Sequence, residues 1–235
     1  VRKHIKEREE MIMMNTWGDR NQDLAINEAF VKREVNAAVK LGITHLQVDD
    51  GWQVGLSSNT AVETAERDTF WNRWTKEAWE PAPHKFPNGF QVVKDYADEK
   101  GVKLGLWFNP SSKNDYEHWE RDADIIIDLY QEYDIRYFKI DGISLPSKRA
   151  ELNLIKFFDK VYVETDSAVV FNLDATAGTR AGYHYINPFY GNIFLENRYT
   201  DWGNYYPYWT LRNLWMLSKY IPAEGFQMEF LNKWR

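Results

Sequence analysis

Short apolar runs alternate with longer amphipathic stretches along most of the chain. Five stretches with helical periodicity lie between seven runs that have the length and composition of strands. The strands are predicted at residues 11–15, 45–49, 103–108, 136–141, 168–173, 192–196 and 221–226, and the helices at 22–41, 88–100, 116–133, 148–164 and 207–219. Gly42 and Gly101 stand where two of these helices should end, as C-terminal caps. Such alternation is typical of βα units around a parallel sheet.

Polar residues at the strand ends favour a closed barrel over a doubly wound sheet. A doubly wound sheet would carry a Gly-rich phosphate loop after its first strand, and NTWGDRNQD at residues 15–23 is not one. Barrel enzymes instead gather polar residues where successive strands end. Those residues here are Asn15, Asp49, Asp50, Asn109, Asp141, Asn172, Asp174, Glu196 and Asn197. We predict an α/β fold, a (β/α)₈ TIM barrel whose eighth unit is missing from the C-terminal end or too irregular to identify.

The chain contains no internal repeat, low-complexity segment or linker, so residues 1–235 are predicted to form one domain. No run of about twenty apolar residues occurs, which predicts no membrane span. The first ten residues, VRKHIKEREE, lack the apolar core of a signal peptide. Because residue 1 is Val, we expect a piece of a longer protein, and the localisation stays unknown.

Composition narrows the classes of partner and chemistry. The formal net charge is −6 and no Lys/Arg stripe occurs, which argues against nucleic acid or a membrane surface as partner. The chain has no Cys, and its five His lack zinc-site spacing, so we expect neither a metal nor a cofactor. Aromatic residues make up 16% of the chain, with 11 Trp, which indicates an aromatic-lined cleft or, alternatively, a Trp-rich core.

Carboxylates are the best candidates for chemistry. Neither GxSxG nor Cys is present, which leaves no familiar Ser or Cys nucleophile. Lys139 and Asp141 should share one face of their strand, because side chains alternate with a period of two. Two carboxylates on separate barrel strands can flank a glycosidic bond, one as nucleophile and one as proton donor. Asp141 and Asp201 are the candidates.

Four motifs occur in order, each after its own strand: VDDGWQ at 48–53, KLGLWFNP at 103–110, YFKIDG at 137–142 and ENRYTDW at 196–202. Together they resemble the α-galactosidase barrel of glycoside hydrolase clan D, family 36 in particular, from about Asn15 to Pro222. The resemblance implies a retaining α-galactosidase acting on a terminal α-galactosyl residue of a small or oligosaccharide substrate. It also implies flanking β domains, of which the chain shows neither, and a homo-oligomer.

The resemblance implies a role for each matching residue. Asp141 would be the nucleophile that forms a covalent glycosyl-enzyme, and Asp201 the acid/base, with Glu196 competing for that role. The residues expected to bind the substrate are Asp49, Asp50, Trp17, Trp52, Trp107, Lys139, Asp174 and Arg198. Simpler alternatives remain: Asp201 as an acid at a helix start, Lys139 and Asp141 as a structural ion pair, and Trp107 as core.

Three departures from the family pattern leave the sugar and linkage open. Ile143 stands where many members have Asn, the third strand continues as WFNPS, and NLDATAGTR at 172–180 replaces a Cys-Ser-Gly-Gly-type loop. Asp174, Thr176 and Arg180 would then take over contacts of that loop to the sugar ring. The sequences DDGWQ at 49–53 and WFNP at 107–110 also resemble those of raffinose synthases. An α-galactosyltransferase, a hydrolase of another α-glycoside and a non-catalytic carbohydrate-binding barrel are therefore the alternative functions.

Overall fold

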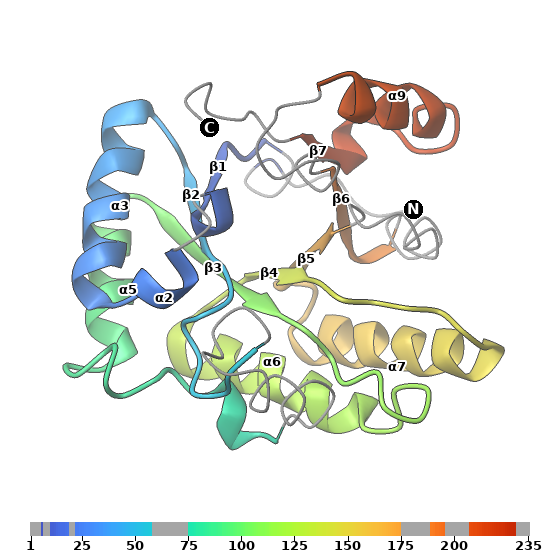
Figure 1. Cartoon of the computed structure of the whole chain (residues 1–235), viewed down its shortest axis with the longest axis horizontal. Helices are drawn as coiled ribbons and strands as arrows, with labels where there is room; N and C mark the ends of the chain where they lie inside the picture. The colour runs from blue at the N-terminus through green and yellow to red at the C-terminus, as the bar shows by residue number, and fades with distance from the viewer. Residues whose placement is uncertain are drawn as a thin grey trace.

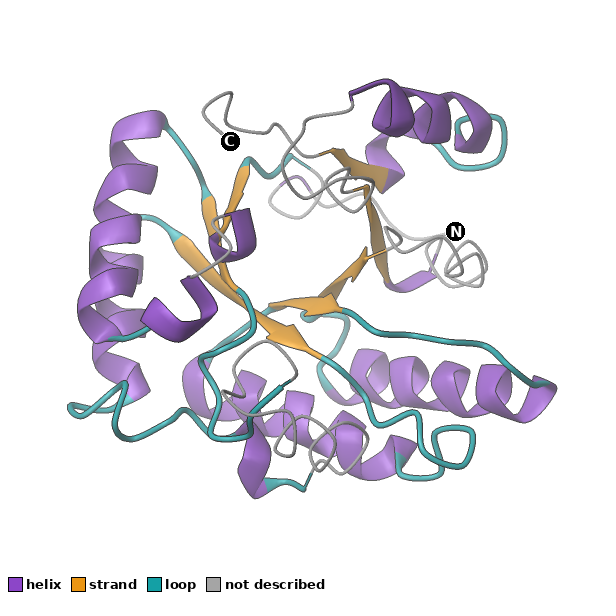
Figure 2. Cartoon of the chain, viewed as in Figure 1, coloured by secondary structure: helices purple, strands orange, loops and turns teal. Residues whose placement is uncertain are grey.

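The computed structural model describes residue 6 and residues 10–18, 22–57, 75–174, 189–195 and 207–228. Its strands form one parallel sheet in chain order, curled into an open barrel wall (Figures 1 and 2). They are β1 (Met13–Asn15), β2 (His45–Val48), β3 (Lys103–Phe108), β4 (Tyr137–Ile140), β5 (Val170–Asp174), β6 (Gly191–Leu195) and β7 (Phe226–Met228). The predicted barrel class is confirmed, with seven strands in the part of the chain that the structure describes.

The long helices lie on the outer side of the curled sheet (Figure 2). The α-helices are α2 (Gln22–Ala25), α3 (Glu28–Leu41), α5 (Phe90–Glu99), α6 (Trp119–Tyr133), α7 (Lys148–Glu164) and α9 (Pro207–Leu217), and the 3₁₀ turns are η1 (Thr16–Gly18), η2 (Glu77–Trp79) and η4 (Ala223–Gly225). Gly42 and Gly101 have φ of 70° and 73°, which confirms both predicted helix ends. Among the described residues, no helix is both long and apolar enough to cross a bilayer.

Three predicted boundaries were wrong, each for a local reason. The helix predicted at 22–41 is two helices, because Asn27 is extended and its side chain accepts the Phe30 N–H as the N-cap of α3. The helix predicted from residue 116 begins at Trp119, after a left-handed turn. The strand predicted at 221–226 is mostly the turn η4 after Pro222, and β7 begins at Phe226.

Strand alternation separates an apolar face from a polar one. Leu106, Phe138 and Phe171 are register partners on β3, β4 and β5, and all three are buried in the main core cluster. The neighbouring row, Trp107, Lys139 and Asn172, carries polar or hydrogen-bonding groups and points to the opposite face. This second face is the barrel interior, and its upper rim holds the candidate site.

Candidate active site

Asp141 directly follows β4, and hydrogen bonds fix its carboxylate. The indole Nε1 of Trp107 donates to Oδ2 at 3.2 Å, and the backbone N–H of Gly142 donates to Oδ1 at 2.6 Å. The N–H of Asp141 donates to the Phe108 carbonyl at 3.1 Å, which continues the pairing of β4 with β3. Donors aimed at a carboxylate favour its ionised form. The half-buried Asp141 carboxylate is thus held in one orientation at the barrel rim.

Lys139 lies one layer below, between two other predicted site residues. Its Nζ is 2.8 Å from Asp49 Oδ2 and 3.6 Å from Asp174 Oδ2. All three side chains are at most 2% exposed. Buried charges persist only when they are paired, so each carboxylate requires this ammonium. The structure therefore brings Lys139, Asp49 and Asp174 into one cluster. We call it the lysine–carboxylate cluster.

The paired acids of the VDDGWQ motif have different surroundings. The N–H of Asp49 donates to Thr16 Oγ1 at 2.9 Å, and Asp49 reaches Lys139 across the barrel. Asp50 instead holds the loop that follows β2: Gln53 Nε2 donates to its Oδ1 at 2.8 Å, and the Ser57 hydroxyl donates to its Oδ2. Its implied contact with a sugar hydroxyl stays a prediction.

The predicted aromatic walls fall into two groups. The ring of Trp17 is half-buried and lies 5.9 Å from Lys139 Nζ, at the edge of the lysine–carboxylate cluster. Trp52 is fully buried, and its Nε1 donates to the Trp107 carbonyl at 3.0 Å. Trp79 packs beside both, with its ring centroid 5.4 Å from that of Trp107. Trp52 and Trp79 therefore belong to a Trp-rich core. Both contact Trp107.

Several predicted residues lie outside the described part of the chain: Asp201, its rival Glu196, and Arg198. Their roles stay predictions. Sequence reasoning in turn missed Thr16, Gln53, Ser57 and Trp79. Only Trp79 gave a signal, because it belongs to a Trp-rich loop, whereas the other three are small polar residues of ordinary turns. Within the described ranges, no three His, Asp or Glu side chains are grouped closely enough to hold a metal ion.

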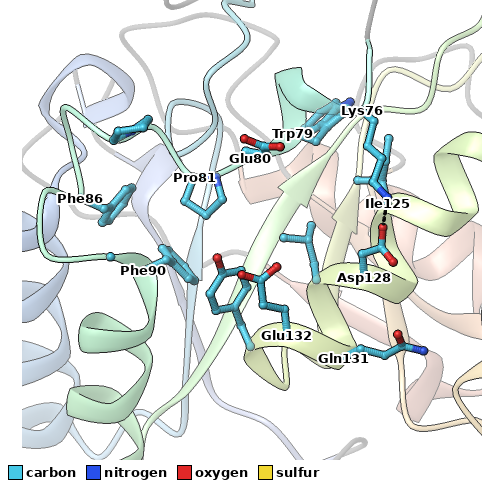
Figure 3. A pocket seen from close by; sticks show the side chains of 14 residues that line it. Lys76, Trp79, Glu80, Pro81, Phe86, Phe90, Ile125, Asp128, Gln131 and Glu132 are labelled. Carbon is cyan, nitrogen blue, oxygen red and sulfur yellow. Dashed lines mark ion pairs between the residues drawn. The ribbon is translucent and has the colours of Figure 1, made fainter.

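A cavity of about 660 Å³ opens on the outer side of the sheet, between η2, the start of α5 and α6 (Figure 3). Phe86 and Phe90 line one side and Ile125 the other, and an ion pair between Lys76 and Asp128 lies at its edge. Neither Asp141 nor the lysine–carboxylate cluster lines it. The candidate site is thus defined by its charged groups at the barrel rim and not by this cavity.

Comparison with known proteins agrees with this geometry. A family model described as Melibiase matches residues 1–137, more than half of the 235 residues. The α-galactosidase Mel36A of Lactobacillus acidophilus is 32% identical over 110 residues, which is 47% of this chain and 13% of that protein. The α-galactosidase AgaA of Geobacillus stearothermophilus is 29% identical over 106 residues, 45% of this chain and 12% of that protein.

A crystal structure of an AgaA variant in complex with raffinose superposes with a TM-score of 0.58 at 21% sequence identity. The superposition covers 83% of this chain and 32% of that one. At this identity the likeness shows the barrel fold. The chain spans about a third or less of each of these longer relatives.

Proposed function

The chain belongs to the melibiase family, and on that premise we propose that it forms the catalytic barrel of a retaining α-glycoside hydrolase that removes terminal α-galactosyl residues. One observation carries the proposal: a half-buried carboxylate, Asp141, fixed by two donors directly above the lysine–carboxylate cluster. Its position at the carboxyl end of β4 is where barrel enzymes place catalytic groups. The relatives that match the sequence are named α-galactosidases.

In the proposed first step, a carboxylate oxygen of Asp141 attacks the anomeric carbon of the galactosyl residue. The bond from that carbon to the leaving oxygen breaks, and this oxygen takes a proton from Asp201. A β-linked glycosyl ester of Asp141 results. Trp107 and Gly142 hold the attacking carboxylate in one orientation before the substrate arrives, which lowers the reorganisation that the reaction requires.

In the second step, Asp201 accepts a proton from a water molecule, and the water oxygen attacks the anomeric carbon from the face that the first leaving group occupied. The bond between the carbon and Asp141 breaks, which regenerates the carboxylate and releases α-galactose. Two inversions give net retention. Asp49, Asp174 and Lys139 supply charged hydrogen-bonding groups beside Asp141 for the sugar hydroxyls, and Trp17 supplies an apolar face.

The substrate class follows from the same groups and the relatives. Asp49 and Asp174 pair with one ammonium, and Asp141 adds a third carboxylate two residues after Lys139, so a neutral sugar rich in hydroxyl donors fits better than an anionic one. A raffinose complex is known for an AgaA variant. We propose neutral oligosaccharides with a terminal α-galactosyl residue as substrates of this protein.

The test uses the protein and its Asp141→Gly variant with p-nitrophenyl α-galactoside, with and without sodium azide. We expect the wild type to release nitrophenol and the variant to be inactive until azide replaces the missing nucleophile and forms β-galactosyl azide. Asp134→Gly is the matched control. Asp134 is exposed and has φ of 53°, a conformation that glycine adopts readily, so its removal should leave the rate unchanged.

An Asp141→Gly variant with wild-type activity, or one that azide restores as the α-azide, would contradict the assignment of Asp141. Product analysis with raffinose then separates two outcomes of a working nucleophile. Free galactose indicates hydrolysis. A lengthened oligosaccharide shows that a sugar hydroxyl intercepts the glycosyl-enzyme, as in an α-galactosyltransferase.

A further inference from the structure

The loop between β3 and α6 contains a left-handed turn of three residues that are not glycine. Asn114, Asp115 and Tyr116 have φ of 47°, 60° and 61°. Asn and Asp tolerate this conformation because their short side chains bond locally, whereas an aromatic residue rarely adopts it. Such a conformation persists only where its surroundings enforce it, and it is concentrated at functional sites. The contacts of Tyr116 therefore indicate the structural role of the turn.

Tyr116 uses its hydroxyl to hold the backbone of another loop. The side chain is 1% exposed, and its hydroxyl accepts the N–H of Ser144 at 2.8 Å and donates to the Ser144 carbonyl at 2.9 Å. The turn itself is anchored to α7, because Asn153 Nδ2 donates to the Asp115 carbonyl at 2.8 Å. One buried phenol thus satisfies both backbone groups of Ser144.

Ser144 belongs to the segment that aims Asp141. Residues 141–147 connect β4 to α7 without regular structure, so side-chain contacts must hold them. Gly142 donates its N–H to the Asp141 carboxylate, and the side chain of Asn109 closes against the α-carbon of Gly142. A Cβ at position 142 would lie only 2.0 Å from Asn109 Nδ2. The segment is therefore braced at Gly142 by Asn109 and at Ser144 by Tyr116, both from the chain that follows β3.

We infer that Tyr116 is a positioning residue for the nucleophile: its hydroxyl clamps Ser144 and thereby fixes the segment whose N–H orients the Asp141 carboxylate. The inference rests on the proposed function for the role of Asp141. Tyr116 acts through the backbone and not on the substrate. Its loss should therefore reduce the rate of glycosyl transfer to Asp141 more than the affinity for the sugar.

The first experiment compares Tyr116→Phe with Tyr96→Phe. Tyr116→Phe loses two hydrogen bonds to Ser144, and Tyr96→Phe loses one, from its hydroxyl to Asn36 Oδ1 at 2.8 Å. Tyr96 joins α5 to α3 and is remote in sequence from the Asp141 segment. With p-nitrophenyl α-galactoside we expect kcat of Tyr116→Phe to fall about 10- to 100-fold, the effect of a small misplacement of a reacting group, while KM changes little. Tyr96→Phe should keep both constants. Equal kcat in the two variants would overturn the inference.

A second comparison separates positioning from a general structural role. In the Asp141→Gly background with azide, the nucleophile no longer depends on the segment, so adding Tyr116→Phe should lower the rescued rate much less than it lowers the wild-type rate. The same fold-loss in both backgrounds would show that Tyr116 only supports the fold, and would overturn its role toward Asp141.

A third measurement does not depend on activity. Hydrogen exchange at the backbone amides of residues 142–144 should become faster in Tyr116→Phe and stay unchanged in Tyr96→Phe. Unchanged protection in Tyr116→Phe would contradict the clamp. If the wild type fails to cleave α-galactosides, the proposed function fails, and the exchange measurement still decides whether Tyr116 holds the segment.

Discussion

At the scale of single residues, Gly142 has the most demanding position near Asp141. Its φ is 66°, and a side chain there would collide with Asn109. Only glycine adopts this backbone without cost and leaves the space that Asn109 fills. The N–H that orients Asp141 therefore depends on the absence of a side chain at the next residue.

We predict that Gly142→Ala destabilises the protein by about 1–3 kcal/mol through its backbone conformation, with a further steric contribution. Gly42→Ala is the matched control, because Gly42 has φ of 70° and nothing within 4 Å of the added Cβ. Urea unfolding should give the larger loss for Gly142→Ala, and adding Asn109→Ala should recover the difference. If Gly142→Ala and Gly42→Ala lost the same free energy of unfolding, Asn109 would move aside without a cost in stability.

Lys139 is the second residue whose neighbours leave little freedom. It is fully buried, and its ammonium pairs with two carboxylates, Asp174 on β5 and Asp49 at the end of β2. Removal of the ammonium would leave both buried acids without the positive charge that pairs with them.

We predict that Lys139→Met destabilises the protein by about 3–5 kcal/mol, the usual cost of leaving buried charges without their partner. The double variant Lys139→Met with Asp174→Asn should be less destabilised than the sum of the two single changes, because one repulsive charge is gone. Thermal unfolding of the four proteins checks this. Additive losses would mean that Asp174 and Lys139 do not interact energetically.

At the scale of elements, β2 carries a buried base at its start. His45 is 4% exposed; its ring packs edge-on against Tyr137 at 4.3 Å, and its Nδ1 is 2.7 Å from Thr44 Oγ1. Burial, with a smaller contribution from the charge of Lys103, lowers the pKa of His45 from 6.5 to about 4. The folded protein therefore keeps this ring neutral at pH values where the unfolded chain protonates it.

Between pH 6.5 and about 4 the unfolded chain binds more protons than the folded one at His45, so stability should fall as the pH falls through this range. The contribution is about 3 kcal/mol over the whole range. In urea titrations at pH 7 and pH 4, His45→Gln should lose less stability on acidification than the wild type. His118→Gln, which changes a side chain 43% exposed, should behave like the wild type. Equal losses in His45→Gln and wild type would contradict the buried neutral ring.

At the same scale, three left-handed residues, 114–116, form the turn before α6. Each non-glycine residue in this conformation costs about 1–3 kcal/mol unless its surroundings compensate. Tyr116 and the Asn153 hydrogen bond to Asp115 provide the compensation here. The turn also shortens α6, which begins at Trp119.

At the scale of the molecule, the two faces of the sheet have different roles. The outer face of β3, β4 and β5 is apolar and packs against the helices, while the inner face carries hydrogen-bonding and charged groups that meet at one rim. Asp49, Asp141 and Asp174 contribute three carboxylates there, and Lys139 contributes the ammonium that pairs with Asp49 and Asp174. The chain itself has a net charge of −6.

This excess of negative charge predicts selectivity against acidic sugars. Placing a like charge at such a site costs several kcal/mol, so kcat/KM for p-nitrophenyl α-galacturonide should be at least about 100-fold below that for the α-galactoside. Asp174→Asn removes one carboxylate and should narrow the gap. Steady-state kinetics with both substrates decide the matter, and comparable kcat/KM values would refute the electrostatic argument.

From the sequence alone follow the barrel class, six of the seven strands to within two residues, and the strand ends at which polar groups gather. They do so because alternation with a period of two and helical periodicity are local properties of the chain. The strand ends also supplied Asp49, Lys139, Asp141 and Asp174 as candidates, and in the structure Lys139 pairs with Asp49 and Asp174.

The contacts that each of these groups makes depend on the tertiary structure. Lys139 shares its face with Asp141, but its ammonium pairs with Asp49 and Asp174, which are 90 and 35 positions away. Asp50 accepts a hydrogen bond from Gln53 in the loop that follows it, and the Trp52 indole donates to the Trp107 carbonyl in the core. Tyr116 donates to the Ser144 carbonyl. These choices depend on the closure of the sheet and on long-range packing, which no local pattern of hydrophobic and polar residues encodes.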